Sequence, residues 1–115
     1  MTQPPIDQPT FAELEQTAGA DFVRELVDTF LTEAPLMLAS LDRALAARDA
    51  GEFRRAAHSL KSNSNTFGAL TLGALARELE LSGLDPALAS NGRSLEALQR
   101  EYARVAAALT ELRHA

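Results

Sequence analysis

The amino-acid sequence predicts an all-α protein, namely an antiparallel four-helix bundle with a short additional N-terminal helix. Of its 115 residues, 46% are hydrophobic but only 5% aromatic, and a Leu- and Ala-rich composition of this kind favours helices over sheets. Apolar residues recur every three or four positions in four long segments, the spacing of a single buried helix face. The length suits one domain. We expect an extended arm over residues 1–9 and the bundle over residues 10–115.

The first two helices are predicted from caps and breakers. Three prolines in the first nine residues favour an extended arm. Thr10 and Glu13 then match a capping box, which predicts a short helix that ends near Gly19. Asp21 is the expected cap of a long second helix. Pro35 lies within its apolar pattern, but the pattern keeps its phase across the proline, so we expect one kinked helix rather than two.

The remaining three helices follow in the same way. A turn at residues 49–52 precedes the third helix, and Gly68 stands where a helix usually ends in the left-handed conformation. Thr71 is the expected cap of the fourth helix, which ends near Gly83, and residues 85–92 are the expected connection. The last helix carries a narrow apolar seam typical of bundle packing, formed by Leu95, Leu98, Tyr102, Val105, Leu109 and Leu112.

Composition excludes several classes of function. The chain has no Cys, which excludes disulfides, thiol nucleophiles and cysteine-ligated zinc. Its net charge of −5 argues against a nucleic-acid-binding face, because such a face is basic. No targeting segment or membrane-spanning apolar run is recognisable. We therefore expect a cytoplasmic protein, with neither nucleic acid nor membrane as a partner.

One group of side chains in the third helix is suited to chemistry. His58, Lys61, Ser62 and Asn65 fall on a single outward stripe, because residues three and four apart share a helix face. Lys61 is the only Lys, beside ten Arg. A neutral imidazole is nucleophilic near pH 7, and a nearby ammonium can neutralise phosphoryl oxygens. The stripe therefore suits a histidine that receives a phosphoryl group.

Plainer interpretations apply to the other polar side chains. An exposed His beside a Lys is more often mere surface than a reactive site. His114 is expected to be surface or a fraying tail, and Glu78 and Glu80 the solvated side of their helix. No carboxylate lies three or four residues from His58, so no metal site is expected.

The run from Ala56 to Ala69 resembles the signature of histidine-containing phosphotransfer (HPt) domains. That signature is His-x-x-Lys, then a small residue, and a Gly ten residues after the His, matched by His58, Lys61, Ser62 and Gly68. Flanking positions across nearly the whole chain are also similar to the family. Ser62 departs from the commoner Gly. In this family the helix continues through the polar run at residues 62–66, so we expect a helix to about Phe67 although Ser, Asn and Thr disfavour it.

The resemblance implies a role for each matched residue. His58 would accept the phosphoryl group, and Lys61 would stabilise its charge. Ser62 would permit close docking, Gly68 would mark the tight end of the helix, and Asn65 shares the docking stripe. On the neighbouring long helix, antiparallel register about Gly51 places Leu36, Ser40 and Arg43 off the buried seam. Of these three, Leu36 is the best candidate for an exposed apolar contact.

The resemblance also implies the partners. These are receiver domains of response regulators, a sensor histidine kinase, or both, and the chain would be a phosphocarrier without catalysis of its own. The sequence leaves the oligomeric state open, with a monomer as the default expectation. No cofactor is expected on this chain, since magnesium belongs to the receiver domain. Two alternatives stay open. One is a histidine kinase dimerisation domain, although the acidic residue after the His and the Pro a few positions on are lacking. The other is a helical adaptor that keeps only the fold.

Overall fold

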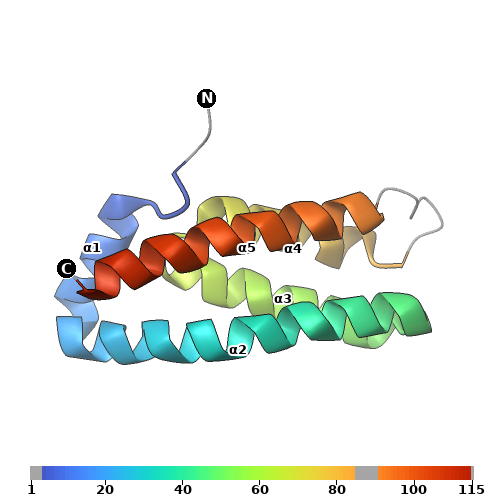
Figure 1. Cartoon of the computed structure of the whole chain (residues 1–115), viewed down its shortest axis with the longest axis horizontal. Helices are drawn as coiled ribbons and strands as arrows, with labels where there is room; N and C mark the ends of the chain where they lie inside the picture. Colours follow the sequence, from blue (N-terminus) through green and yellow to red (C-terminus); the bar gives the residue numbers. More distant parts are fainter. Residues whose placement is uncertain (1–3, 85–90, 115) are drawn as a thin grey trace.

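The computed structural model describes residues 4–84 and 91–114, which form five helices. These are α1 (Gln8–Ala18), α2 (Ala20–Ala47), α3 (Ala50–Thr66), α4 (Leu70–Ser82) and α5 (Asn91–His114). Each helix from α2 to α5 packs against the next, and α2 also packs against α5, so the four close into a bundle. Figure 1 looks onto α2 and α5 with α3 and α4 behind them, while α1 covers one end. The predicted four-helix bundle with an added N-terminal helix is confirmed.

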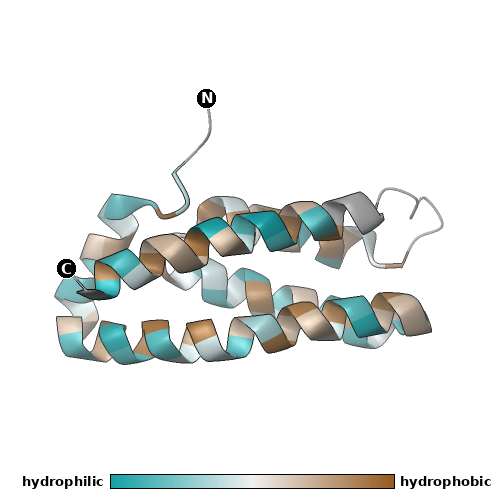
Figure 2. Cartoon of the chain, viewed as in Figure 1, coloured by the Kyte–Doolittle hydropathy of each residue, from teal (hydrophilic) through white to brown (hydrophobic). Residues whose placement is uncertain are grey.

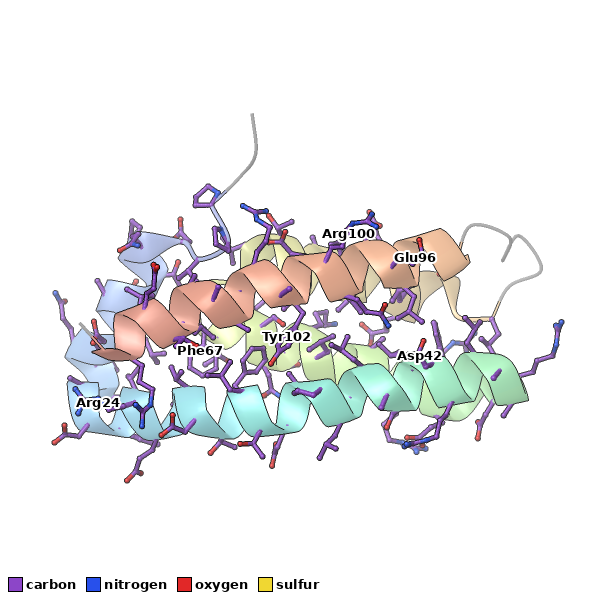
Figure 3. The ribbon with its side chains drawn as sticks, viewed as in Figure 1. Arg24, Asp42, Phe67, Glu96, Arg100 and Tyr102 are labelled. Carbon is purple, nitrogen blue, oxygen red and sulfur yellow. The ribbon has the colours of Figure 1, made fainter. Side chains whose placement is uncertain are left out.

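The core consists of the apolar faces predicted from the helical spacing. Brown and teal segments alternate along α2 and α5 in Figure 2, as expected of amphipathic helices. Phe30 of α2 packs against two other rings, with centroid distances of 5.4 Å to Phe67 and 6.0 Å to Tyr102; both partners lie between α2 and α5 in Figure 3. The largest fully buried side chains include Leu41, Phe53, Leu60, Leu72, Leu79, Leu98 and Leu109.

The first helix begins earlier than predicted. Asp7, rather than Thr10, is the N-cap of α1, and its side chain accepts hydrogen bonds from both the backbone N–H and the hydroxyl of Thr10. The predicted capping box of Thr10 and Glu13 is therefore wrong, and the extended arm is shorter than residues 1–9. Pro9 does not prevent this start, because proline fits the first turn of a helix, where its missing N–H has no partner to lose.

Two other predicted caps are also wrong. Gly19 caps α2, and Asp21 lies in the first turn instead, where its carboxylate suits the positive end of the helix dipole. Ala69, rather than Thr71, is the N-cap of α4. By contrast, α2 is one continuous helix that contains Pro35, as its apolar pattern predicted.

The third helix runs through the polar stretch at residues 62–66 and ends in a tight turn. It extends to Thr66, with Phe67 as the C-cap, which confirms the prediction made against local propensity. The Ala69 N–H donates to the Ser64 carbonyl at 2.9 Å and the Gly68 N–H to the Asn65 carbonyl at 3.1 Å. These two bonds form a Schellman motif, and Gly68 adopts its positive φ of 82°.

The N-terminal segment closes over this turn. The Asp7 N–H donates to the Gly68 carbonyl at 2.8 Å, and Ile6 is buried in the core. A Cβ on Gly68 would lie 2.9 Å from the Asp7 carbonyl oxygen, closer than real contacts allow. Glycine is therefore required at position 68 both by its backbone conformation and by the approach of the N-terminal segment.

The last helix begins at Asn91, so the predicted connection over residues 85–92 is too long at its C-terminal end. Residues 85–90 lie outside the described part of the chain, as does the side chain of His114. Within the part described, no helix is long and apolar enough to span a membrane.

Candidate functional site

His58 lies in the middle of α3, on the side that faces solvent. Its side chain is 59% exposed, whereas Ala57 and Leu60 on either side of it are fully buried. Ser62, one turn further along, is exposed and small, so no bulky residue of that turn covers the imidazole. The predicted exposure of the ring is confirmed.

A carboxylate from the neighbouring helix contacts both charged members of the predicted stripe. Glu80 of α4 places Oε2 2.7 Å from His58 Nδ1 and Oε1 2.7 Å from Lys61 Nζ. One carboxylate thereby holds the imidazole and the ammonium side by side. The expectation that Glu80 is simply solvated surface is wrong, since its side chain is only 23% exposed.

Lys61 is less accessible than the helical stripe indicated. Its side chain is 24% exposed, and its ammonium is hydrogen-bonded to Glu80 Oε1. The expected neighbour of His58 is therefore present, but it is engaged in an ion pair rather than free in solvent.

The two contacts keep Glu80 ionised. The hydrogen bond from Lys61 is the largest influence that lowers the pKa of the Glu80 carboxyl below its ordinary value of 4.5, followed by the hydrogen bond from His58. Partial removal from water acts in the opposite direction but is outweighed. Near neutral pH the group is a carboxylate.

The contact with this carboxylate determines which ring nitrogen of His58 carries a proton. An ionised carboxylate only accepts hydrogen bonds, so the Nδ1 atom that contacts Glu80 carries a proton. In the neutral ring the other nitrogen, Nε2, then keeps its lone pair. A lone pair of this kind can act as a nucleophile, and the contact with Glu80 holds the ring orientation that leaves it available.

The other predicted stripe residues have different environments. Asn65 is exposed, but its amide packs on α4, because a Cβ on Gly73 would lie only 2.1 Å from Asn65 Oδ1. Gly68 is buried, so its contribution is to the turn that ends α3 rather than to a surface that a partner touches. The structure thus places His58, Lys61 and Ser62 together, with Asn65 one turn beyond Lys61 and Gly68 beneath the surface.

A groove lies between α2 and α3 beside His58. Its volume is about 320 Å³, and Leu36 on its edge is 64% exposed. The groove is lined by Glu33, Leu36, Met37 and Ser40 of α2 and by Glu52, Arg55, Ala56 and Ser59 of α3. Leu36 and Ser40 therefore occupy the predicted rim. Arg43 is not part of the lining; it is exposed and donates to Ser40 Oγ at 3.2 Å.

Comparison with known proteins identifies the family. A family model described as the Hpt domain matches residues 25–108. The chain belongs to the Hpt domain family. Its function is therefore histidine phosphotransfer within a phosphorelay, the function that the His58 signature predicted.

A solved Hpt structure supports the same assignment along the whole chain. The crystal structure of histidine-containing phosphotransfer protein B (HptB) from Pseudomonas aeruginosa PAO1 is 33% identical in sequence, with a TM-score of 0.89. The similarity covers 98% of this chain and 97% of that one, so it includes α1, which lies outside the matched family model. The comparison with curated proteins found no match.

Sequence reasoning missed Glu80 because the contact joins two helices. Helical spacing relates only residues on one helix, and position 80 lies 22 residues after position 58. A usable signal did exist. A helical hairpin centred on Ala69 aligns residues equally distant from that position, which brings Glu80 opposite His58 and Gly73 opposite Asn65.

Proposed function

We propose that His58 is the phospho-accepting residue of this Hpt domain and that Lys61 stabilises the charge of the bound phosphoryl group. The observation that carries the proposal is the contact of one carboxylate, Glu80, with both His58 Nδ1 and Lys61 Nζ. This arrangement leaves Nε2 as the free nucleophile of an exposed imidazole, with a cation held beside it.

The phosphoryl group arrives from the phospho-aspartate of a receiver domain. The Nε2 lone pair attacks phosphorus, the bond between phosphorus and the aspartyl oxygen breaks, and the aspartate leaves as a carboxylate with the bonding electron pair. The Nδ1 proton stays on the ring and continues to face Glu80. Transfer to a second receiver aspartate reverses these steps, and phosphorus is the only centre at which bonds change.

The receiver domain supplies the rest of the chemistry. Magnesium is expected on the receiver rather than on this chain, and we propose a carrier without autonomous catalytic activity and without a cofactor. Phosphoryl transfer depends mainly on positioning and charge stabilisation, which a carrier meets with an exposed ring and one cation. We further propose that the protein acts in the cytoplasm as a monomer, with receiver domains, a sensor histidine kinase, or both as partners.

We propose that partners dock over His58 and along the groove between α2 and α3. Leu36 offers an exposed apolar contact there, and Ser62 leaves room beside the ring. Ser59, the residue after His58, also lines the groove, so a receiver seated in the groove would bring its aspartate close to the imidazole. Asn65 extends this surface, while Gly68 supports it from within.

Phosphotransfer from a radiolabelled, phosphorylated receiver domain tests the proposal. The chain has two histidines, so His58→Gln and His114→Gln are matched variants. We expect acid-labile label on the wild type and on His114→Gln but not on His58→Gln. Label retained by His58→Gln would show that another residue accepts the phosphoryl group. Stable receiver binding without any label on the wild type would favour an adaptor.

A further inference from the structure

The ammonium that should serve the phosphoryl group already has a partner. Lys61 Nζ lies 2.7 Å from Glu80 Oε1, and the Lys61 side chain is only 24% exposed. In the unphosphorylated protein the Lys61 ammonium and the Glu80 carboxylate balance each other's charge. The charge of Lys61 is therefore already paired before a phosphoryl group is added.

Phosphorylation of His58 would change that balance. A phosphoryl group brings close to two negative charges and three strong acceptor oxygens. Because Lys61 and His58 contact the same carboxylate, the new group would be bound to a ring that lies beside the ammonium. One cation would then face both the phosphoryl oxygens and Glu80.

We propose that Glu80 competes with the phosphoryl group on His58 for the Lys61 ammonium, so that the Lys61–Glu80 ion pair is a resting contact that phosphorylation exchanges. This inference rests on the proposed role of His58. Lys61 can make the exchange because its ammonium is a point charge on a flexible stem with three donors. Glu80 would keep its hydrogen bond from Nδ1 and lose its bond from Lys61.

The exchange gives Glu80 a second role besides orienting the ring. Breaking the resting ion pair costs free energy that is recovered when the phosphoryl group leaves. Glu80 thus disfavours the phosphorylated form and promotes onward transfer. A neutral residue at position 80 that still accepts the Nδ1 hydrogen bond would orient the ring but leave Lys61 available, and the phosphorylated form would accumulate.

The Glu80→Gln variant separates the two roles, because glutamine is neutral but its side-chain oxygen still accepts the Nδ1 hydrogen bond. Phosphoramidate is a suitable donor because it needs no partner protein: its P–N bond breaks, ammonia leaves with the electron pair and a proton, and Nε2 bonds to phosphorus. At fixed phosphoramidate and ammonium concentrations, we expect the equilibrium ratio of phosphorylated to free protein, measured by phosphorus NMR, to rise about two- to fivefold, as for loss of a partly exposed ion pair. Glu78→Gln removes the same charge from an exposed position of α4 and should leave the ratio unchanged.

A double-mutant cycle distinguishes competition for Lys61 from simple repulsion between Glu80 and the phosphoryl group. In a Lys61→Met background, Glu80→Gln should no longer raise the ratio. An equal rise in both backgrounds would overturn the proposal in favour of repulsion, and so would an unchanged or lower ratio in Glu80→Gln alone.

Nitrogen NMR of the Lys61 ammonium gives a readout that a purely structural role of Glu80 would not change. The Lys61 resonance should differ between wild type and Glu80→Gln before phosphorylation. After phosphorylation the two chemical shifts should become equal, because the phosphoryl group is then the partner of Lys61 in both proteins. Persistence of the initial difference would contradict the exchange. A wild-type protein that takes up no phosphoryl group at His58 would overturn the proposed function as well, whereas normal uptake without the Glu80 effect would overturn only this inference.

Discussion

The amide of Asn65 occupies the space that a side chain at position 73 would need, since a Cβ on Gly73 would lie 2.1 Å from Asn65 Oδ1. The two residues fix the distance between α3 and α4 one turn from Lys61, on the same pair of helices that brings Glu80 to His58. The register of α3 against α4 that requires close packing at Gly73 is thus the same register that brings Glu80 to His58.

Gly73→Ala should therefore push the two helices apart or displace Asn65. We expect a loss of about 1–3 kcal/mol in the free energy of unfolding, as for other overpacked positions, measured by urea denaturation. The double variant Gly73→Ala with Asn65→Ala removes the obstructing amide and should recover part of the loss. No recovery would show that Asn65 is not the obstacle.

Gly68→Ala should destabilise the fold for a different reason. The backbone at Gly68 has a φ of 82°, which costs a residue with a side chain about 1–3 kcal/mol, and the added methyl would meet the Asp7 carbonyl. Thermal and urea unfolding measure the loss. Gly51→Ala is the control: it lies in the first turn of α3 with its nearest obstacle 3.8 Å away, so it should be neutral or stabilising by up to about 1 kcal/mol.

Glu80 should make stability depend on pH. Its pKa is held below the ordinary 4.5 by Lys61 and His58, so its contribution is present above about pH 4.5 and is lost as pH falls through the lowered pKa. Wild type should exceed Glu80→Gln in stability near neutral pH, and the difference should shrink under acid conditions. Chemical denaturation across pH 3–7, with Glu78→Gln as the control, measures this. A difference that does not vary with pH would contradict the ion pair.

Lys61→Ala should shorten the lifetime of the phosphorylated form without unfolding the bundle. Removal of the ammonium leaves the phosphoryl charge unneutralised, while the core beneath Lys61 is unchanged. Loss of label after removal of the donor gives the lifetime, and circular dichroism checks the fold. Arg24→Ala removes a positive charge near the start of α2, far along the bundle from His58, and should have no effect. Equal lifetimes for Lys61→Ala and wild type would make Lys61 a bystander.

Leu36→Ala should weaken receiver binding while leaving direct phosphorylation by phosphoramidate intact. An exposed apolar side chain on the edge of a groove is a typical interface contact, and its truncation is expected to cost about 1 kcal/mol of binding free energy. Calorimetry with a receiver domain measures the change. Leu81 of α4 is similarly exposed, at 70%, but is not part of the groove lining, so Leu81→Ala is the matched control. Equal losses in both variants would remove the groove from the docking surface.

Features that depend on residues close together in the sequence were predicted better than contacts between helices. Repeating apolar residues predicted the four bundle helices, and the phase of the pattern across Pro35 correctly predicted one continuous α2. The family resemblance correctly predicted that α3 passes through residues 62–66, where propensity alone predicted a break. The cap of α1 was mispredicted because proline near a helix start permits two boundaries.

The site was predicted only where it depends on one helix. His58, Lys61 and Ser62 share a face of α3 because of helical spacing alone. Glu80 was missed because its contacts arise from the packing of α4 against α3, and the ion pair of Lys61 was missed for the same reason. The lowered pKa of Glu80 and its contact with His58 Nδ1 follow from that packing.

The position of His58 between two different neighbours has an evolutionary consequence. On one side α4 contributes the carboxylate that contacts the ring, and on the other side α2 and α3 form the groove that includes Leu36. Under the proposed docking, substitutions along α2 would change which partner is recognised without disturbing the ring, while substitutions at position 80 would change reactivity without altering recognition. A duplicated copy of this domain would then acquire a new partner through substitutions on one helix while the proposed phospho-accepting site stays constant.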